Sequence, residues 1–359
     1  MSGPVPWSTL ITQGVAMSWN RVASAGGALL LAAATVVVLP GAAGAVDDRP
    51  TAVVSLGDSA ISGEGAGSYE PGTMGENGNW CHRSTQAMVH RTRLADRTFN
   101  LACSGADSAN VSLADTVHYT EGSQARRLID IARQNRVTAV VVQVGANDDP
   151  RFADTMVDCV AAWVNALGPS CRSRLQAEWP ARLAAMAPKV EQAVRDVRSA
   201  MSQAGYADSS YSFVLTSYAS PVTEKMDRLL HGPQGCPLRI DDAGYGRTVA
   251  VPQLSEALRG VATRTGVKFL DLSRATENRE ACSKGITTSG EWQRRLTVDP
   301  YALVTGGLDA IGLHLAQQSF HPNAAAHGQL GRCLTEFVTS GAGSARCLEG
   351  SDGNLHAVA

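Results

Sequence analysis

Residues 51–67 read TAVVSLGDSAISGEGAG, an apolar run that leads through Gly-Asp-Ser into a segment rich in glycine. The run from Ala52 to Leu56 is short and apolar enough to form a buried strand. The segment after Ser59 is a poor phosphate-binding loop, because it lacks the GxGxxG spacing and the GK[ST] ending and because Glu64 would repel a phosphate. We therefore predict a strand, a turn that exposes Ser59, and a bend formed by Gly63 to Gly67.

Four more β-rich runs follow along the chain, and helical patterns separate several of them. The runs cover residues 98–102, 138–144, 212–216 and 267–270. Apolar residues with the spacing of one helical face occur around residues 125–132 and 190–201. This alternation predicts an α/β fold in which helices cover both sides of a mostly parallel five-stranded sheet.

The first part of the chain has the three-part pattern of a secretory signal peptide. A single arginine precedes an alanine-rich apolar run over residues 23–39, and the small residues Ala-Gly-Ala at 43–45 match a cleavage site. We expect a signal peptide over residues 1–45 and one exported domain over residues 46–359. Two alternatives stay open: Met17 as the true start, and an uncleaved anchor.

All eight cysteines lie in the exported part, and an even number in an oxidising compartment suggests four disulfides. Eight cysteines allow many pairings, so the pairing of chain neighbours is one choice among them: Cys81 with Cys103, Cys159 with Cys171, Cys236 with Cys282, and Cys333 with Cys347. None of the spacings is CxxC, which argues against a zinc ribbon or a redox motif.

The composition favours a globular protein with a sizeable core, because 44% of the residues are hydrophobic and only 18% are charged. The formal net charge of the whole chain is −2, and removing Arg21 with the leader subtracts one positive charge and leaves −3. There is no basic stripe that nucleic acid would grip. The charge pattern therefore excludes nucleic acid as a partner.

Polar and small residues follow the predicted strands. Cys-Ser-Gly-Ala with Gly105 follows the second strand, Gly-Ala-Asn-Asp with Asn147 follows the third, and Ser-Phe-His-Pro-Asn places His321 before a predicted C-terminal helix. Because ligands of such a sheet gather at the carboxyl ends of its strands, we expect these residues and Ser59 to meet in one crevice. They would supply a nucleophile, a backbone donor, an amide donor and a base.

These four motifs, in this order, resemble the four blocks of the SGNH or GDSL hydrolase family, and above all its secreted, disulfide-bearing actinobacterial esterases and lipases. The resemblance covers nearly the whole exported chain and implies a flavodoxin-like three-layer α/β/α architecture. It also implies that Ser59 is the nucleophile and His321 the base. The oxyanion hole would consist of the main-chain NH groups of Ser59 and Gly105 and the side-chain amide of Asn147.

Each motif also has a purely structural explanation. The Gly-Asp-Ser and Gly-Ala-Asn-Asp motifs are ordinary turn sequences, the glycine of the second block would let Cys103 reach Cys81, and His321 would be a surface histidine. The four explanations would all have to hold by coincidence. A competing histidine, His327, follows six positions later and is expected to pack inside the C-terminal helix.

The chain departs from the family at the acid of the catalytic triad. The family usually has an aspartate three residues before the histidine, where this sequence has Gln318. We expect the main-chain carbonyl of Gln318 to accept the hydrogen bond from His321 instead. Asp309 is a more distant alternative acid.

The sequence thus predicts a secreted serine ester hydrolase, an esterase or lipase that acts on a small-molecule or lipid ester through an acyl-enzyme. No HExxH motif or other metal-ligand cluster is present, so no cofactor or metal is expected. We expect a monomer without a stable membrane anchor, and a substrate pocket built from residues 152–172 and 221–247. Two alternatives remain: a polysaccharide O-acetyl esterase and a non-catalytic extracellular binding protein on the same fold.

Overall fold

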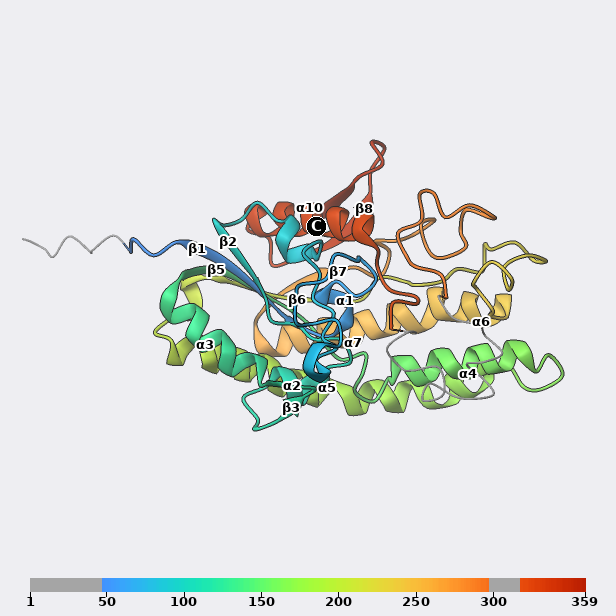
Figure 1. Ribbon diagram of the computed structural model, residues 1–359, viewed down its shortest axis with the longest axis horizontal. Helices are drawn as coiled ribbons and strands as arrows, with labels where there is room; N and C mark the ends of the chain where they lie inside the picture. The colour runs from blue at the N-terminus through green and yellow to red at the C-terminus, as the bar shows by residue number, and fades with distance from the viewer. Residues whose placement is uncertain (1–46, 297–316) are drawn as a thin grey trace, which may run out of the picture. The chain divides into compact units, whose positions relative to one another are not determined.

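The computed structural model describes residues 47–296 and 317–359, which belong to one compact unit, Asp47–Ala359 (Figure 1). The predicted signal peptide and Asp309 therefore lie outside the described residues. In the ranges that are described, no helix is both long and apolar enough to cross a membrane.

The unit is built on a seven-stranded sheet with the order β2-β1-β5-β6-β7-β8-β9. Its strands are β1 (Thr51–Gly57), β2 (Arg97–Asn100), β5 (Arg136–Gln143), β6 (Ser212–Thr216), β7 (Lys268–Asp271), β8 (Ser344–Glu349) and β9 (Leu355–Val358). All neighbours pair in parallel except β8 and β9. The five predicted strands are present, and their spatial order is that of a flavodoxin-like sheet.

The prediction of five strands was wrong by two, because β8 and β9 extend one edge of the sheet. Their sequences, SARCLE and LHAV, mix polar and apolar residues, and both strands are only partly buried. An edge hairpin needs a single buried face, so it lacks the continuous apolar run by which the inner strands were identified.

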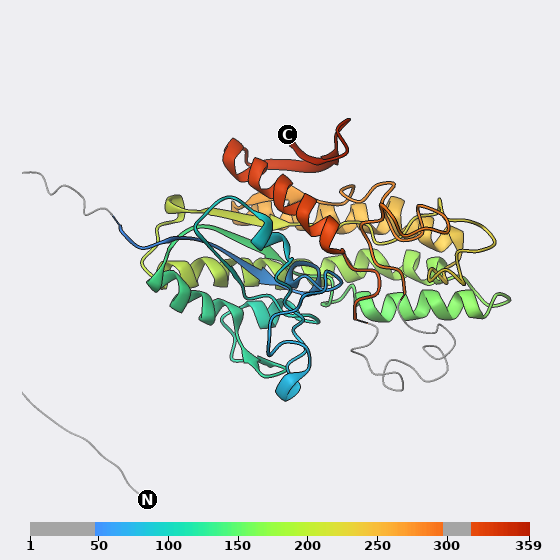
Figure 2. The ribbon, with the colours of Figure 1, turned by 45° about the horizontal axis from the view of Figure 1, so that its top comes forward.

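Helices cover both faces of the sheet, as expected (Figures 1 and 2). On one face α3 (Gln124–Gln134), α5 (Cys171–Gln203) and α7 (Val251–Thr265) pack on the residues that alternate with Val53 along β1. On the other face α10 (Ala324–Ser340) and the short helix η2 (Met88–Arg91) cover Val53 itself. The two faces thus carry separate apolar cores.

The remaining elements are short or lie at the ends of the strands. They are α1 (Ser59–Ser62), α2 (Ser108–Val111), α4 (Phe152–Val164), α6 (Ile240–Tyr245), the turns of helix η1 (Glu76–Gly78), η3 (Asp208–Ser210) and η4 (Gly246–Ala250), and the hairpin β3 (Val117–His118) with β4 (Glu121–Gly122). The predicted helical patterns at 125–132 and 190–201 fall within α3 and α5.

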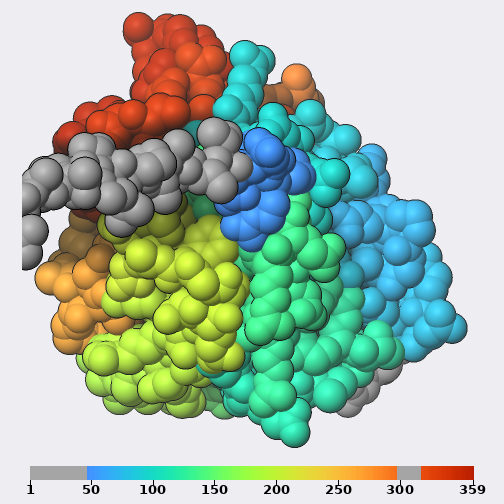
Figure 3. All heavy atoms as spheres, turned by 90° about the vertical axis from the view of Figure 1, so that its left-hand side faces the viewer, coloured from blue at the N-terminus to red at the C-terminus, as the bar shows by residue number. Residues whose placement is uncertain are grey.

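Two features of the ends of the unit place the site. At the end where β1 begins, which Figure 3 faces, Arg49 donates hydrogen bonds to the carbonyls of Ala132 and Arg133 near the end of α3. The carboxyl ends of the strands lie at the opposite end, where the chain leaves β1, β2 and β5 in loops.

The four disulfides are those of chain neighbours: Cys81–Cys103, Cys159–Cys171, Cys236–Cys282 and Cys333–Cys347.

Candidate active site

Ser59 is the first residue of α1, directly after β1. Asp58 caps this helix, because its carboxylate accepts a hydrogen bond from the main-chain NH of Ala60 at 3.1 Å. Gly63 ends the helix after one turn with a left-handed φ of 94°. The sequence therefore holds the Ser59 side chain at the carboxyl end of β1, where it is 8% exposed.

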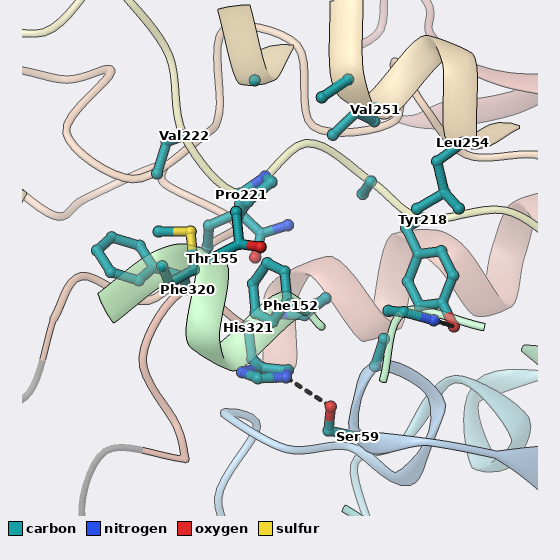
Figure 4. Close-up of a pocket in the computed structure, with 18 of the residues that line it drawn as sticks. Ser59, Phe152, Thr155, Tyr218, Pro221, Val222, Val251, Leu254, Phe320 and His321 are labelled. Carbon is teal, nitrogen blue, oxygen red and sulfur yellow. Dashed lines mark hydrogen bonds between the residues drawn. The ribbon is translucent and has the colours of Figure 1, made fainter. Parts of the chain in front are cut away.

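His321 reaches Ser59 from the far end of the chain. Its Nε2 atom lies 2.7 Å from the Ser59 Oγ atom, although 262 positions separate the two residues (Figure 4). Its Nδ1 atom lies 2.9 Å from the carbonyl oxygen of Ser319. Since a carbonyl can only accept, Nδ1 carries the proton and Nε2 presents its lone pair to the Ser59 hydroxyl. This is the geometry of a nucleophile and its general base.

The carbonyl that supports His321 is that of Ser319, and the expectation of Gln318 was wrong. The physical reason is the backbone of Phe320, which has a left-handed φ of 59° at the end of a turn over residues 317–320. This conformation reverses the chain just before His321, and the carbonyl two residues earlier meets the imidazole ring.

The surroundings keep His321 neutral. Burial lowers the pKa of its imidazole, and the negative charge of Glu64 opposes this effect only in part. With 9% of its surface exposed, His321 is nearly enclosed, and the ring of Phe152 packs edge-on at 5.8 Å between centroids. A base with a lowered pKa is available to accept a proton below pH 6.5 as well as above it.

Donors for a developing negative charge lie around Ser59. Within the described part of the chain, nothing accepts a hydrogen bond from the main-chain NH groups of Ser59 and Gly105. The side-chain amide of Asn147 gives one hydrogen to the carbonyl of Ala106 at 3.0 Å and keeps a second. Ser59, Gly105, Asn147 and His321 all line one cavity of about 910 Å³, so the structure brings the four predicted residues together.

Gly105 is required for its backbone rather than for space. A Cβ atom at Gly105 would meet its nearest neighbour, His118, at an ordinary distance of 3.4 Å, but the backbone φ of 81° is one that side chains disfavour. A side chain at this position would therefore strain the loop that follows β2.

A second cavity begins at Ser59 and His321 and is lined by residues of α4, α5 and α7, among others (Figure 4). Its volume is about 1140 Å³, part of it open to solvent. Its walls are almost entirely apolar, with Phe152, Met156, Leu175, Trp179, Val222, Leu238, Val251, Leu254 and Phe320 among the lining residues. Both segments expected to build the pocket, residues 152–172 and 221–247, contribute to it.

Sequence reasoning missed a buried polar group beside the nucleophile. The Tyr218 hydroxyl donates to the Asp58 carboxylate and accepts from the main-chain NH of Ala146. Burial raises the pKa of Asp58 to about 7, and it raises the pKa of Asp148 to about 6. Asp148 is partly buried and accepts two hydrogen bonds from Ser108, one from its main-chain NH and one from its hydroxyl.

His327 lies in α10, as predicted, and is fully buried. Its Nδ1 atom accepts a hydrogen bond from the main-chain NH of Met88 at 3.1 Å. Burial lowers its pKa to about 3, so this histidine stays neutral and joins α10 to η2. Among the residues that the structure describes, no group of three or more histidines, cysteines and carboxylates is arranged to hold a metal ion.

Comparison with known proteins places this geometry in a family. A sequence model of the GDSL-like Lipase/Acylhydrolase family matches residues 55–329. "Lipase 2" of Streptomyces coelicolor is 25% identical over 239 residues, which cover 64% of this chain and 72% of that protein.

Two solved structures are similar in fold. An extracellular lipase from Streptomyces rimosus, 22% identical, aligns with a TM-score of 0.53 over 77% of this chain and 94% of that chain. Phospholipase A1 from Streptomyces albidoflavus NA297, 20% identical, aligns with a TM-score of 0.54 over 82% of this chain and 100% of that chain. Both likenesses support an α/β fold with a mostly parallel central sheet.

Proposed function

Because the chain belongs to the GDSL-like lipase/acylhydrolase family and is a carboxylic ester hydrolase, we propose that Ser59 is its nucleophile and His321 its general base. The observation that carries this proposal is the 2.7 Å contact between Ser59 Oγ and His321 Nε2 at the junction of two cavities. The hydroxyl gives its proton to Nε2 as its oxygen attacks the ester carbonyl. The imidazolium then returns that proton to the departing alcohol, and a water molecule hydrolyses the acyl-enzyme by the same steps.

Negative charge forms on the carbonyl oxygen of the substrate during both steps. We assign its stabilisation to the main-chain NH groups of Ser59 and Gly105 and to the second hydrogen of the Asn147 amide. Replacing Asn147 with alanine would remove one of these donors, which typically lowers the rate by about 100-fold to 1,000-fold.

We propose that the apolar cavity holds the acyl chain and the other cavity, beside Gly105, holds the alcohol part. The first cavity is lined by residues of α4, α5 and α7, and most of its wall is apolar, as an alkyl chain requires. The preferred substrates are therefore esters of medium or long fatty acids. An acetyl group would leave most of this cavity empty, so we place the lipid ester ahead of the polysaccharide O-acetyl ester.

We also propose that the protein is exported. The support is the leader pattern over residues 1–45 and the four disulfides, which form and persist in oxidising compartments. N-terminal sequencing of the protein from the culture medium is expected to begin near Val46. A full-length chain that stays in the cell would contradict export.

The test of this function is hydrolysis of p-nitrophenyl esters from acetate to palmitate, with acetylated xylan in parallel. We expect kcat/KM to rise with chain length beyond acetate, and Ser59→Ala to abolish hydrolysis of every ester. Leu254→Trp, which narrows the acyl cavity, should lower the rate for long chains and spare acetate. Equal activity of Ser59→Ala and wild type would refute the nucleophile, and a preference for acetylated xylan would refute the acyl assignment.

A further inference from the structure

A buried carboxylate, Glu64, lies in the loop that follows Ser59. It is 0% exposed, and its carboxylate accepts hydrogen bonds from His82 Nδ1 at 2.8 Å, Ser104 Oγ at 2.7 Å and the Tyr69 hydroxyl at 3.1 Å. Burial raises its pKa, but the hydrogen bond from His82 and the positive charge of a protonated His321 outweigh this and hold the pKa below its usual value. Glu64 therefore stays ionised inside the protein.

The loop that carries Glu64 is packed directly on His321. A Cβ atom at Gly65 would lie 3.1 Å from the His321 Cβ atom and 3.0 Å from the Pro322 carbonyl oxygen. Arg294 joins the same two segments, because its Nε donates to the Gly65 carbonyl and its main-chain NH donates to the His321 carbonyl at 2.9 Å. The position of Glu64 relative to His321 is thus fixed by backbone contacts.

The other side of the carboxylate is equally well held. Ser104 precedes Gly105, and its hydroxyl also accepts a hydrogen bond from the Gln317 amide at 3.0 Å, in the turn before His321. His82 has a left-handed φ of 45° and stacks on the Tyr69 ring at 4.6 Å between centroids. A non-glycine residue in this conformation persists only where its surroundings require it.

We propose that Glu64 is a positioning residue that supplies, across space, the negative charge which the neutral Ser319 carbonyl cannot give to the His321 imidazolium. The proposal rests on the proposed roles of Ser59 and His321. It divides the task of a triad acid between two groups: Ser319 fixes the tautomer and orientation of the ring, and Glu64 stabilises its charged form.

Other titratable groups near the dyad do not replace Glu64. His82 donates its Nδ1 hydrogen to Glu64, His327 is neutral, and the Arg294 guanidinium is bound to the Gly65 carbonyl. Asp58 is adjacent to Ser59, but burial raises its pKa to about 7, so it carries only a partial charge at neutral pH.

The test is the pH profile of kcat/KM for a soluble ester, measured for wild type and Glu64→Gln. The acid limb of this profile reports the pKa of His321 in the free enzyme. Without the carboxylate the imidazolium is less stable, so the limb should move to lower pH by about one unit. The plateau should fall about tenfold, since one pKa unit corresponds to a factor of ten.

Asp271→Asn is the matched control, because Asp271 is also a buried carboxylate that accepts two serine hydroxyls, yet it lies at the end of β7, three strands from β1. Its acid limb should coincide with that of wild type. An unmoved or raised limb in Glu64→Gln would overturn the proposal, whatever the plateau does, and so would the same downward shift in Asp271→Asn. None of these outcomes alters the case for the dyad, which stands or falls with Ser59→Ala.

A second measurement needs no variant at Glu64. In Ser59→Ala labelled with ¹³C, the Glu64 carboxyl and the His321 ring are followed through the same pH titration. Glu64 is expected to remain ionised throughout the His321 transition. A Glu64 carboxyl that is protonated over that range would have no charge to offer, and the proposal would be wrong.

Discussion

Ser59 and His321 show what single residues reveal at the sequence level. Both were identifiable because the residue type itself specifies the hydroxyl or the imidazole, and because each residue lies in a short motif. The support of His321 was not, because a main-chain carbonyl belongs to every residue. The left-handed φ of Phe320 decides which carbonyl faces the imidazole, and the side chains at positions 318 and 319 give no indication of it.

The importance of Glu64 could not be predicted from the sequence for a related reason. Its sequence neighbours marked it as part of a glycine-rich bend, and the bend is real, with left-handed φ values at Gly63, Gly65 and Gly67. The partners that give the carboxylate its importance lie elsewhere in the chain, at His82 and Ser104. A single sequence gives no sign that these segments meet.

Because a backbone carbonyl supports His321, the enzyme should tolerate substitutions of the neighbouring side chains. Gln318→Ala and Ser319→Ala should each keep kcat/KM within a few-fold of wild type, because neither removes the Ser319 carbonyl. His321→Ala removes the base and should lower kcat by about 10³-fold or more. A loss in either alanine variant comparable to that of His321→Ala would contradict this support.

We expect Gly65 to matter more for activity than for folding. Gly65→Ala places a methyl group 3.0 Å from the Pro322 carbonyl oxygen and 3.1 Å from His321 Cβ, at a φ of 83°. Because displacement of His321 by even a few tenths of an ångström disturbs its contact with Ser59, kcat/KM should fall at least about tenfold. Gly72→Ala is the control, since its φ is 82° but nothing lies within 4 Å of the added Cβ. Equal activity of the two variants would argue against this role.

At the scale of elements, α5 shows where the sequence pattern was incomplete. The apolar spacing indicated a helix around residues 190–201, yet the helix begins at Cys171 and passes through Pro180 and Pro188. Proline normally breaks a helix because it cannot donate the backbone hydrogen bond. Here one face remains buried on both sides of the prolines, through residues such as Leu175 and Val190, and tertiary packing outweighs local preference.

The disulfide between Cys159 and Cys171 ties α4 to the start of α5, next to the acyl cavity. Replacing both cysteines with serine should lower the free energy of unfolding by about 3 kcal/mol, mainly by relaxing the unfolded chain. It should also reduce the preference for long acyl chains, since Phe152 and Met156 of α4 line the cavity. Denaturant unfolding and the ester series measure the two effects. Unchanged chain-length preference would show that α4 holds its place without the disulfide.

At the scale of the whole molecule, the order of the motifs predicted more than their details did. Strands alternate with helices along the chain, and a motif follows each of the first three predicted strands. In a parallel sheet such motifs lie at one edge, and the loops after β1, β2 and β5 meet there as expected. The extent and the apolar walls of the cavity proposed for the acyl chain could not be predicted from the sequence. They arise where α4, α5 and α7 diverge from the sheet, and that geometry depends on packing between elements distant in the sequence.

One buried carboxyl should make the stability of the molecule depend on pH. Burial raises the pKa of Glu280 to about 7, and its Oε2 atom has no hydrogen-bond partner among the described residues. The folded state thus keeps a proton that the unfolded chain releases near pH 4.5, so stability falls as pH rises from about 4.5 to about 7. The contribution is about 3 kcal/mol at most.

Glu280→Gln removes this titration, so its Tm should fall less between pH 5 and pH 8 than the Tm of wild type does. Thermal unfolding monitored at both pH values measures the difference. Identical pH dependence of the two proteins would contradict a raised pKa at Glu280.

The central claim is that Ser59 becomes acylated with His321 as its base, and active-site labelling tests it most directly. Folded wild type, Ser59→Ala and His321→Ala are each treated with a fluorophosphonate, digested and mapped by mass spectrometry. We expect one phosphonylated peptide in wild type, modified at Ser59, no label in Ser59→Ala, and labelling slowed by orders of magnitude in His321→Ala. A label on another residue, or labelling of His321→Ala at the wild-type rate, would contradict the account.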